Sequence, residues 1–243
     1  MLNVFKHKME RSIESHAILE TSSRVRKAQK IQAILKHSKD IKGASVLDIG
    51  TGSGHIANEL AKEAKRVVSV DLVDERKEKS GYEFMVVDDE ILPFNDSSFD
   101  VVITNHVVEH TPNQTLHLAE IYRVLKPEGV IYLATPNKFW LTDPHYRLPF
   151  ISWLPRSLSQ RYLHFVQGAQ WDIYPLSHFG VRKHFPEGKV INALPILLKT
   201  KAHSTLDTMS RLAKLVKWFP RSVLEATRYF SPTLIYLIKK PKI

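Results

Sequence analysis

Cysteine is absent from the 243 residues of this chain. That absence excludes a disulfide framework and thiol chemistry and is typical of a reducing compartment, so we expect the cytoplasm. No run of about 18 apolar residues occurs, which is the length that a membrane-spanning helix needs. Residues 1–8 hold no apolar run of the kind that a signal peptide requires, and repeats and low-complexity tracts are lacking. The length of 243 residues favours one globular domain with room for an insertion.

Acidic residues are outnumbered by basic ones, 25 against 35, and the formal net charge is +10. A basic surface suggests anionic partners, namely nucleic acid, membrane headgroups or an anionic substrate, whereas a lysine-rich solvated surface is the alternative. No basic-aromatic RNA-binding module is visible, so nucleic acid is not the partner we expect. The excess charge lies toward both ends of the chain: Arg24, Arg26, Lys27, Lys30 and Lys36 in the first part, and Arg211, Lys214, Lys217, Arg221 and Arg228 in the last.

Three glycines follow a short apolar run at residues 46–49. The run is typical of a buried parallel strand, and helix-forming residues follow at 56–65. Gly50, Gly52 and Gly54 therefore occupy a turn between a strand and a helix, where glycine lets the backbone bend sharply and lets a ligand approach. The helix N-terminus behind the turn offers unpaired N–H groups.

The residues around this turn favour a ligand with a positive centre. A dinucleotide fingerprint would have a third glycine where His55 stands, and the carboxylate of Asp48 would repel a diphosphate. The sulfonium and amino groups of S-adenosylmethionine (SAM) would instead be attracted by Asp48. A glycine turn without any ligand is the alternative.

Further carboxylates end the next two expected strands. Residues 66–71 are rich in β-branched side chains and end in Asp71, about 20 residues after the glycine turn, where a carboxylate can accept bonds from both ribose hydroxyls. Residues 84–87 form the next strand, after which Asp88 can accept from an adenine amino group and the backbone of Asp89 can meet a ring nitrogen. The alternatives are a turn residue at Asp71 and an acidic loop at 88–89.

Strands and helices alternate through the first half of the chain. We expect a helix over 22–37 and one over 114–125, with further strands over 98–103 and 129–134. Such alternation predicts an α/β fold, with a parallel sheet and helices on both faces. Its ligand would lie at the carboxyl ends of the strands, where the acidic residues fall.

Five ordered motifs resemble the class I SAM-dependent methyltransferases that act on small molecules, lipids, quinones and sugars. They are residues 46–54, Asp71, Asp88 with residues 92–94, residues 98–102 and residues 125–129. The resemblance covers residues 40–137 and implies a Rossmann-like, seven-stranded, mostly parallel sheet whose last strand runs antiparallel beside the fifth. It also implies SAM as cofactor, with a site made of Asp48, Gly50, Thr51, Gly52, Gly54, Asp71, Leu72, Asp88, Asp89 and Asn105.

One departure from the family pattern is visible between Leu72 and Glu83, which is too short a stretch for a full helix with its turns. We therefore expect the adenine side of the pocket to be less covered than is usual. Residues 104–110 resemble the family's loop beside the transferable methyl group.

Histidines in this loop and beyond it are candidates for proton transfer. His110 can act as a general base on a substrate hydroxyl, oriented by Glu109. His106, Glu109 and His110 could alternatively bind a divalent metal, and a structural Glu-His pair that caps the next helix is the plainer alternative. The predicted chemistry requires no metal.

An irregular segment over 138–188 is rich in proline, histidine and aromatic residues. Long irregular segments tend to be lids or binding loops, so we interpret it as an inserted lid over the acceptor. Within it, His145, Tyr146 and Arg147 can supply a base and an anion-binding cation, although core aromatics and ordinary surface histidines are the alternatives. The segment resembles methyltransferases of bacterial surface-glycan and lipid-linked sugar pathways, which implies O-methylation of a sugar or lipid-linked acceptor.

The last part of the chain completes the expected sheet. Strands are predicted over 189–198 and 233–238, and residues 205–219 form a basic amphipathic helix that either lies on an anionic membrane or covers the sheet. The expected layout is a helical segment over 1–40, a SAM-binding core over 41–137, the lid over 138–188 and the C-terminal part over 189–243.

Together these features predict a methyltransferase that aligns an acceptor oxygen with the SAM methyl group, with His110 or His145 as proton acceptor. A non-catalytic SAM-fold protein that docks a partner or membrane through its basic ends is the main alternative. The three carboxylates at Asp48, Asp71 and Asp88 argue against it. An RNA methyltransferase is supported by charge alone.

Overall fold

The computed structural model describes residues 21–87, 91–199 and 220–242. One sheet of seven strands runs through this part of the chain in the order β3-β2-β1-β4-β5-β7-β6. The strands are β1 (Ser45–Ile49), β2 (Arg66–Asp71), β3 (Glu83–Val86), β4 (Phe99–Asn105), β5 (Leu125–Pro136), β6 (Lys189–Asn192) and β7 (Thr233–Lys239). The helices are α2 (Thr21–Leu35), α3 (His55–Ala61), α4 (Gln114–Val124), α5 (Arg156–Gln167), α6 (His178–His184), α7 (Leu194–Lys199) and α9 (Arg221–Phe230), with short 3-10 turns at Val108–His110 and Ile151–Trp153.

The sheet is mostly parallel, as expected. Strands β1 to β5 pair in parallel, whereas β7 runs antiparallel to both β5 and β6. In the centre, Leu47 of β1 lies opposite Val68 of β2 and Val102 of β4. The antiparallel insertion of the last strand beside β5, which the family resemblance implied, is thereby confirmed.

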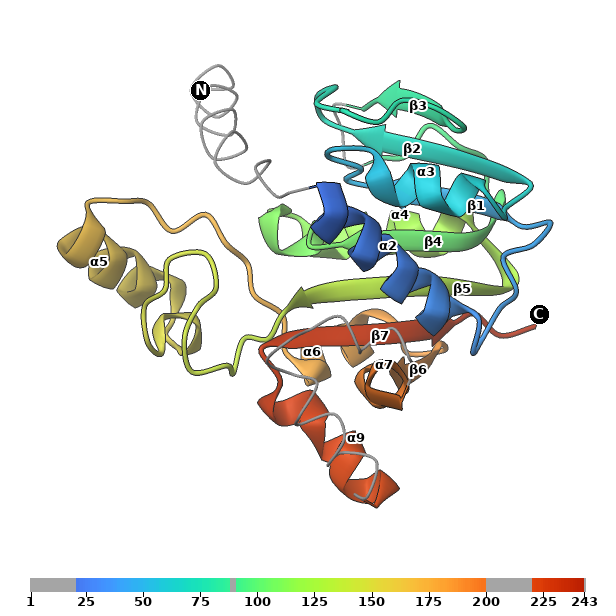
Figure 1. The fold of residues 1–243 in the computed structure, drawn as a ribbon. Helices are drawn as coiled ribbons and strands as arrows, with labels where there is room; N and C mark the ends of the chain where they lie inside the picture. Colours follow the sequence, from blue (N-terminus) through green and yellow to red (C-terminus); the bar gives the residue numbers. More distant parts are fainter. Residues whose placement is uncertain (1–20, 88–90, 200–219, 243) are drawn as a thin grey trace.

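Successive residues of the central strands feed two separate cores because side chains alternate between the faces of a strand. Val46 and Val101 point to the face that α2, α3 and α7 cover, and Leu47 and Val102 point to the face covered by α4 and α6. Since both faces are covered, these strands are mostly apolar, and helices lie on both sides of the sheet (Figure 1).

The strand order reverses between β1 and β4, which are neighbours in the sheet and run parallel to each other. The crossover from β1 leads outward to β2 and β3, while the chain after β4 leads to β5 on the other side. At such a switch point the loops after the two strands diverge and leave a crevice for a ligand. The glycine turn and the loop with Glu109 and His110 both lie there.

The chain leaves the sheet after β5 and forms a small separate body that carries α5 (Figure 1). It has its own core of Leu148, Ile151, Leu163, Trp171 and Ile173. The main core resumes with α6, where Val181 and Phe185 pack beside β5 and β7. The irregular segment is therefore an inserted body up to about α6; its role as an acceptor lid stays a prediction.

Two expected elements differ from the structure. The strand predicted over 189–198 is wrong beyond Asn192, because the Asn192 side chain accepts from the Leu194 backbone N–H and α7 begins there, with Pro195 in its first turn. The helix predicted over 56–65 ends at Ala61. The stretch from Leu72 to Tyr82 contains no helix, as its length predicted.

The basic amphipathic helix expected over 205–219 lies outside the described residues. Among the described helices, none combines the length and the apolar character needed to cross a membrane.

Candidate active site

The glycine turn after β1 uses each of its glycines for a different reason. All three have positive φ, of 72° at Gly50, 51° at Gly52 and 81° at Gly54, a region that side chains disfavour. A Cβ on Gly50 would lie 2.3 Å from a methyl group of Val107, and one on Gly54 would lie 2.1 Å from the carbonyl oxygen of Glu78. A Cβ on Gly52 would meet nothing within 4 Å. Gly50 and Gly54 thus permit close packing, while Gly52 faces open space that a ligand can fill.

Asp48 lies beneath this turn and is only 1 % exposed. Its Oδ2 accepts hydrogen bonds from the Thr51 hydroxyl at 2.8 Å and from the Ser69 hydroxyl at 3.2 Å. Burial raises the pKa of Asp48 to about 6, against the lowering effect of these two bonds. The carboxylate therefore fixes the turn, and a cationic ligand nearby would favour its charged form.

Asp71 ends β2 directly beside the turn. Its Oδ2 accepts from the Gly52 N–H at 2.7 Å, and its Oδ1 accepts from the Leu72 N–H at 2.8 Å. Burial raises the pKa of this carboxyl, although both backbone donors lower it. Each oxygen keeps a lone pair for a further donor such as a ribose hydroxyl.

The rim of the turn is formed by the segment after β2. The backbone N–H groups of Lys77 and Glu78 both donate to the Ser53 carbonyl at 3.1 Å. On the other side, Asn105 ends β4 opposite Ala134 of β5. Asp88 and Asp89, the expected adenine contacts, lie outside the described residues.

Glu109 is the buried centre of the loop after β4. Its Oε1 lies 3.1 Å from His106 Nδ1, and its Oε2 accepts from the Thr135 hydroxyl at 3.0 Å. Burial alone would raise its pKa, but the hydrogen bond with His106 and the charges of His106 and His110 outweigh it, so the pKa is lowered. The Tyr174 N–H donates to the Glu109 carbonyl at 2.7 Å and ties the inserted body to this loop.

His110 and His145, the two predicted proton acceptors, come together from distant parts of the chain. Their rings meet edge to face with centroids 5.1 Å apart. His145 is carried on a turn that the buried Asp143 holds, because one Asp143 oxygen accepts from the backbone N–H groups of His145 and Tyr146 at 2.9 Å each. The pair therefore sits on a fixed frame at the carboxyl edge of the sheet.

A donor set suitable for a metal occurs at the same place. Ligand atoms of Glu109, His110 and His145 all lie within 4.8 Å of one another. The set differs from the one considered from sequence, because His106 is engaged with Glu109 and His145 takes its place. Nothing in the proposed chemistry depends on a metal there.

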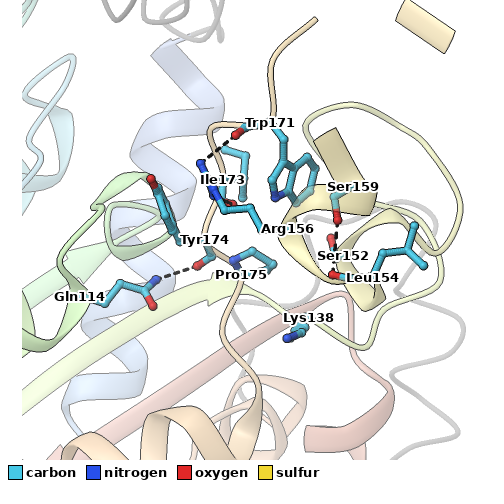
Figure 2. Close-up of a pocket in the computed structure, with 10 residues that line it drawn as sticks. All are labelled: Gln114, Lys138, Ser152, Leu154, Arg156, Ser159, Trp171, Ile173, Tyr174 and Pro175. Atoms are coloured by element: carbon cyan, nitrogen blue, oxygen red, sulfur yellow. Dashed lines mark hydrogen bonds between the residues drawn. The ribbon is translucent and has the colours of Figure 1, made fainter. Parts of the chain in front are cut away.

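A cavity of about 210 Å³ opens between the inserted body and the sheet edge (Figure 2). Its walls include Gln114 at the start of α4, Lys138 after β5 and Arg156 at the start of α5, together with the aromatic Trp171 and Tyr174. Sequence reasoning missed Gln114, Lys138 and Arg156. The concentration of aromatics around 138–175 was the available signal, but no spacing pattern singles these three out.

The other two polar candidates of the segment do not line this cavity. The Tyr146 hydroxyl donates to the Gln170 carbonyl and to Asp172, and its ring packs on Trp171. Arg147 is exposed, with a positive φ of 56°. Tyr146 thus stabilises the inserted body, and neither residue supplies the cavity's positive charge.

Lys27 on α2 was assigned to the basic surface from its sequence. It is half-buried, and its pKa is lowered first by burial and then by the nearby charges of Arg24 and Lys30, while Glu109 raises it. Lys27 is therefore not part of a purely solvated basic face.

Comparisons with known proteins find similarity to methyltransferases. Residues 47–133 match the family described as "Methyltransferase domain". A malonyl-[acyl-carrier protein] O-methyltransferase of Serratia marcescens is 31 % identical over 98 residues, which covers 38 % of each chain. A ubiquinone biosynthesis O-methyltransferase of Xanthomonas oryzae pv. oryzae is 33 % identical over 109 residues, covering 41 % of this chain and 46 % of that protein. The match thus spans less than half the length of either relative.

The likeness to solved structures extends over most of the chain. The S-adenosylmethionine dependent methyltransferase from Mesorhizobium loti aligns with a TM-score of 0.56 at 13 % identity, covering 86 % of this chain and 96 % of that one. At this identity the likeness establishes the fold alone, a Rossmann-like sheet completed by the C-terminal strands.

Proposed function

We propose that this chain, which contains a class I SAM-dependent methyltransferase domain, transfers the methyl group of SAM to an oxygen atom of a small acceptor. One observation carries the proposal. The glycine turn with Asp71 and the His110–His145 pair lie at the same carboxyl edge of the sheet, on the two sides of its switch point. This arrangement supports a donor site and a proton-accepting pair that act side by side.

The residues of the turn suit SAM. The open space at Gly52, the Asp71 carboxylate and the buried Asp48 would hold the methionine and ribose parts, and Asn105 and Leu72 border the same place. When bound, SAM supplies an electrophilic methyl group on a sulfonium. The chain's own contribution is to align the acceptor with that methyl and to exclude water, which accounts for much of such a rate acceleration.

Proton acceptance falls to His110 or His145 and not to Glu109. Both Glu109 oxygens already take part in hydrogen bonds, and its lowered pKa makes it a weak base. Imidazole titrates near neutral pH and can accept the hydroxyl proton as the new O–CH₃ bond forms. Glu109 positions the loop that carries His110.

The acceptor class is supported by the relatives and by the cavity. The two relatives described above are both named O-methyltransferases. The cavity beside Tyr174 adjoins the Glu109–His110 loop and is large enough for part of an acceptor. We propose a sugar or lipid-linked acceptor on the basis of the aromatic inserted body.

Calorimetric titration with SAM and with S-adenosylhomocysteine tests the donor site. We expect one-to-one binding that is lost in Gly52→Val, whose side chain would fill the open space at a positive φ. The control is Gly168→Val, which carries the same strain at φ 66° on the inserted body and should bind normally. Acceptor panels follow; SAM binding without turnover on any acceptor would favour a non-catalytic role.

A further inference from the structure

The charged residues that line the cavity in Figure 2 are both cations, Lys138 and Arg156. No carboxylate is among the ten lining residues. Two buried acids near the wall are engaged elsewhere: Asp143 accepts from the Ser152 hydroxyl at 3.0 Å and from the His145 backbone N–H, and both Glu109 oxygens are bonded to His106 and Thr135. The cavity wall is therefore positive, without a facing carboxylate to neutralise it.

Arg156 is held in place before any ligand arrives. Its Nη2 donates to the Trp171 carbonyl at 2.9 Å, its Nη1 lies 3.4 Å from the Ile173 carbonyl, and the guanidinium covers the Tyr174 ring at 4.2 Å. Figure 2 shows it between Tyr174 and Trp171. A guanidinium has five N–H donors, so donors are left for an anion in a fixed orientation.

Lys138 faces the same cavity from the end of β5. Its backbone N–H donates to the Leu176 carbonyl at 2.9 Å, which fixes the base of the side chain. No acid lies within ion-pairing distance of its ammonium in the described part of the chain. Two neutral side chains of the wall are engaged internally: Ser159 donates to the Ile151 carbonyl, and Gln114 donates to the Tyr174 carbonyl.

We propose that this cavity binds a phosphoryl group of the acceptor, held between Arg156 and Lys138. Two cations of different type suit a phosphate or diphosphate, because the guanidinium fork matches two oxygens while the ammonium acts as a point charge. A cavity of about 210 Å³ is below the usual range of ligand pockets, so it holds a headgroup and not a whole acceptor.

The position of the cavity directs the remainder of the acceptor to the methyl donor. Tyr174, which lines the cavity, is bonded through its N–H to the Glu109 carbonyl, one residue before His110. An acceptor anchored by its phosphate thus reaches the His110–His145 pair with an adjoining hydroxyl. This inference rests on the proposed methyl transfer and names the substrate class for it.

The test uses the full chain and inorganic pyrophosphate as the probe, measured by calorimetry at constant ionic strength. We expect binding in the range of about 1 mM or tighter, weakened about tenfold by Lys138→Gln and by Arg156→Gln. Arg161→Gln is the matched control, since Arg161 is exposed on α5 and does not line the cavity. Arg156 also ties α5 to residues 171–173, so Arg156→Gln can impair folding. In that case the pyrophosphate affinity of Lys138→Gln alone tests the inference.

Two further measurements, S-adenosylhomocysteine binding and co-sedimentation with vesicles, separate the possible outcomes. Wild-type protein that ignores pyrophosphate, or variants that bind it as tightly as wild type, would overturn the inference while S-adenosylhomocysteine binding still stands. If the wild-type protein does not bind S-adenosylhomocysteine at all, the proposed function itself is refuted. Co-sedimentation with vesicles of phosphatidic acid against phosphatidylcholine identifies the source: Lys138-dependent capture indicates a lipid phosphate, and pyrophosphate binding without capture indicates a free one.

Discussion

The donor side and the acceptor side of the proposed site are built in different ways. The donor side is one continuous stretch: β1, the glycine turn and α3, closed by Asp71, with contacts made largely by backbone N–H groups and short side chains. The acceptor side gathers Glu109, His110, His145, Lys138 and Arg156 from four separate segments. The first is a local motif that can recur in many proteins, whereas the second depends on how this chain's inserted body folds back.

The largest effect expected is on the acceptor side. His145→Ala or His110→Ala should lower kcat about 10²–10⁴-fold if that residue is the general base, while leaving SAM affinity unchanged. The measurement is kcat with the identified acceptor, alongside calorimetry with SAM. His164→Ala, an exposed histidine on α5, is the control. Equal loss of SAM affinity would show that the two sides are not separable.

The complementary change is Asp71→Ala on the donor side. It removes a carboxylate that can accept from ribose and that holds the Gly52 N–H, so SAM affinity should fall about a hundredfold. Asp74→Ala, three residues further on in the exposed stretch after β2, removes a carboxylate that pairs with Arg76 and should leave affinity within a few-fold. Unchanged affinity in Asp71→Ala would refute the ribose assignment.

Two glycine substitutions compare the stability of the two sides. Gly54→Ala would bring a Cβ against the Glu78 carbonyl and should cost about 1–3 kcal/mol beyond backbone strain. Gly168→Ala on the inserted body has φ 66° and open space around it, so it should cost only the strain, about 1–2 kcal/mol. Urea denaturation followed by circular dichroism measures both, and equal losses would contradict the packing role of Gly54.

The smallest expected effect is a pH dependence of the donor side. Burial raises the pKa of Asp48 to about 6 from 3.8, so the folded chain binds a proton that the unfolded chain has lost, and stability falls as pH rises between these values. Cationic SAM favours the charged form and should bind more tightly above about pH 6.

Asp48→Asn should abolish that dependence. Near neutral pH it should also raise the free energy of unfolding, because the neutral amide removes a buried charge while its oxygen can still accept from Thr51. Titrations at about pH 5 and about pH 8 measure this, with neutral S-adenosylhomocysteine as the less pH-dependent control. An affinity for SAM that is flat across this range would place its cationic groups away from Asp48.

Much of the fold followed from patterns that neighbouring residues set. The runs 46–49 and 67–70 are buried, with side chains in both cores, and the glycine turn directly follows the first run, so the parallel core was predictable. The structure of 189–198 was not predictable, because its apolar residues suit a strand and a buried helix equally. The Asn192 side chain accepts from the Leu194 N–H, where the strand ends and α7 begins. The sequence predicted His110 and His145 as two separate candidates, and only the structure shows that their rings meet.

The sequence by itself determined the parallel strands, the switch point and the turn that joins Asp48 to Asp71, because each is set by contacts between residues close along the chain or by strand periodicity. The tertiary structure alone decided which cations line the cavity beside the inserted body. Lys138 and Arg156 line it and Arg147 does not, because of the way the inserted body folds against the sheet edge. Such long-range placement has no period in the sequence, since it follows from packing between segments that the chain itself keeps far apart.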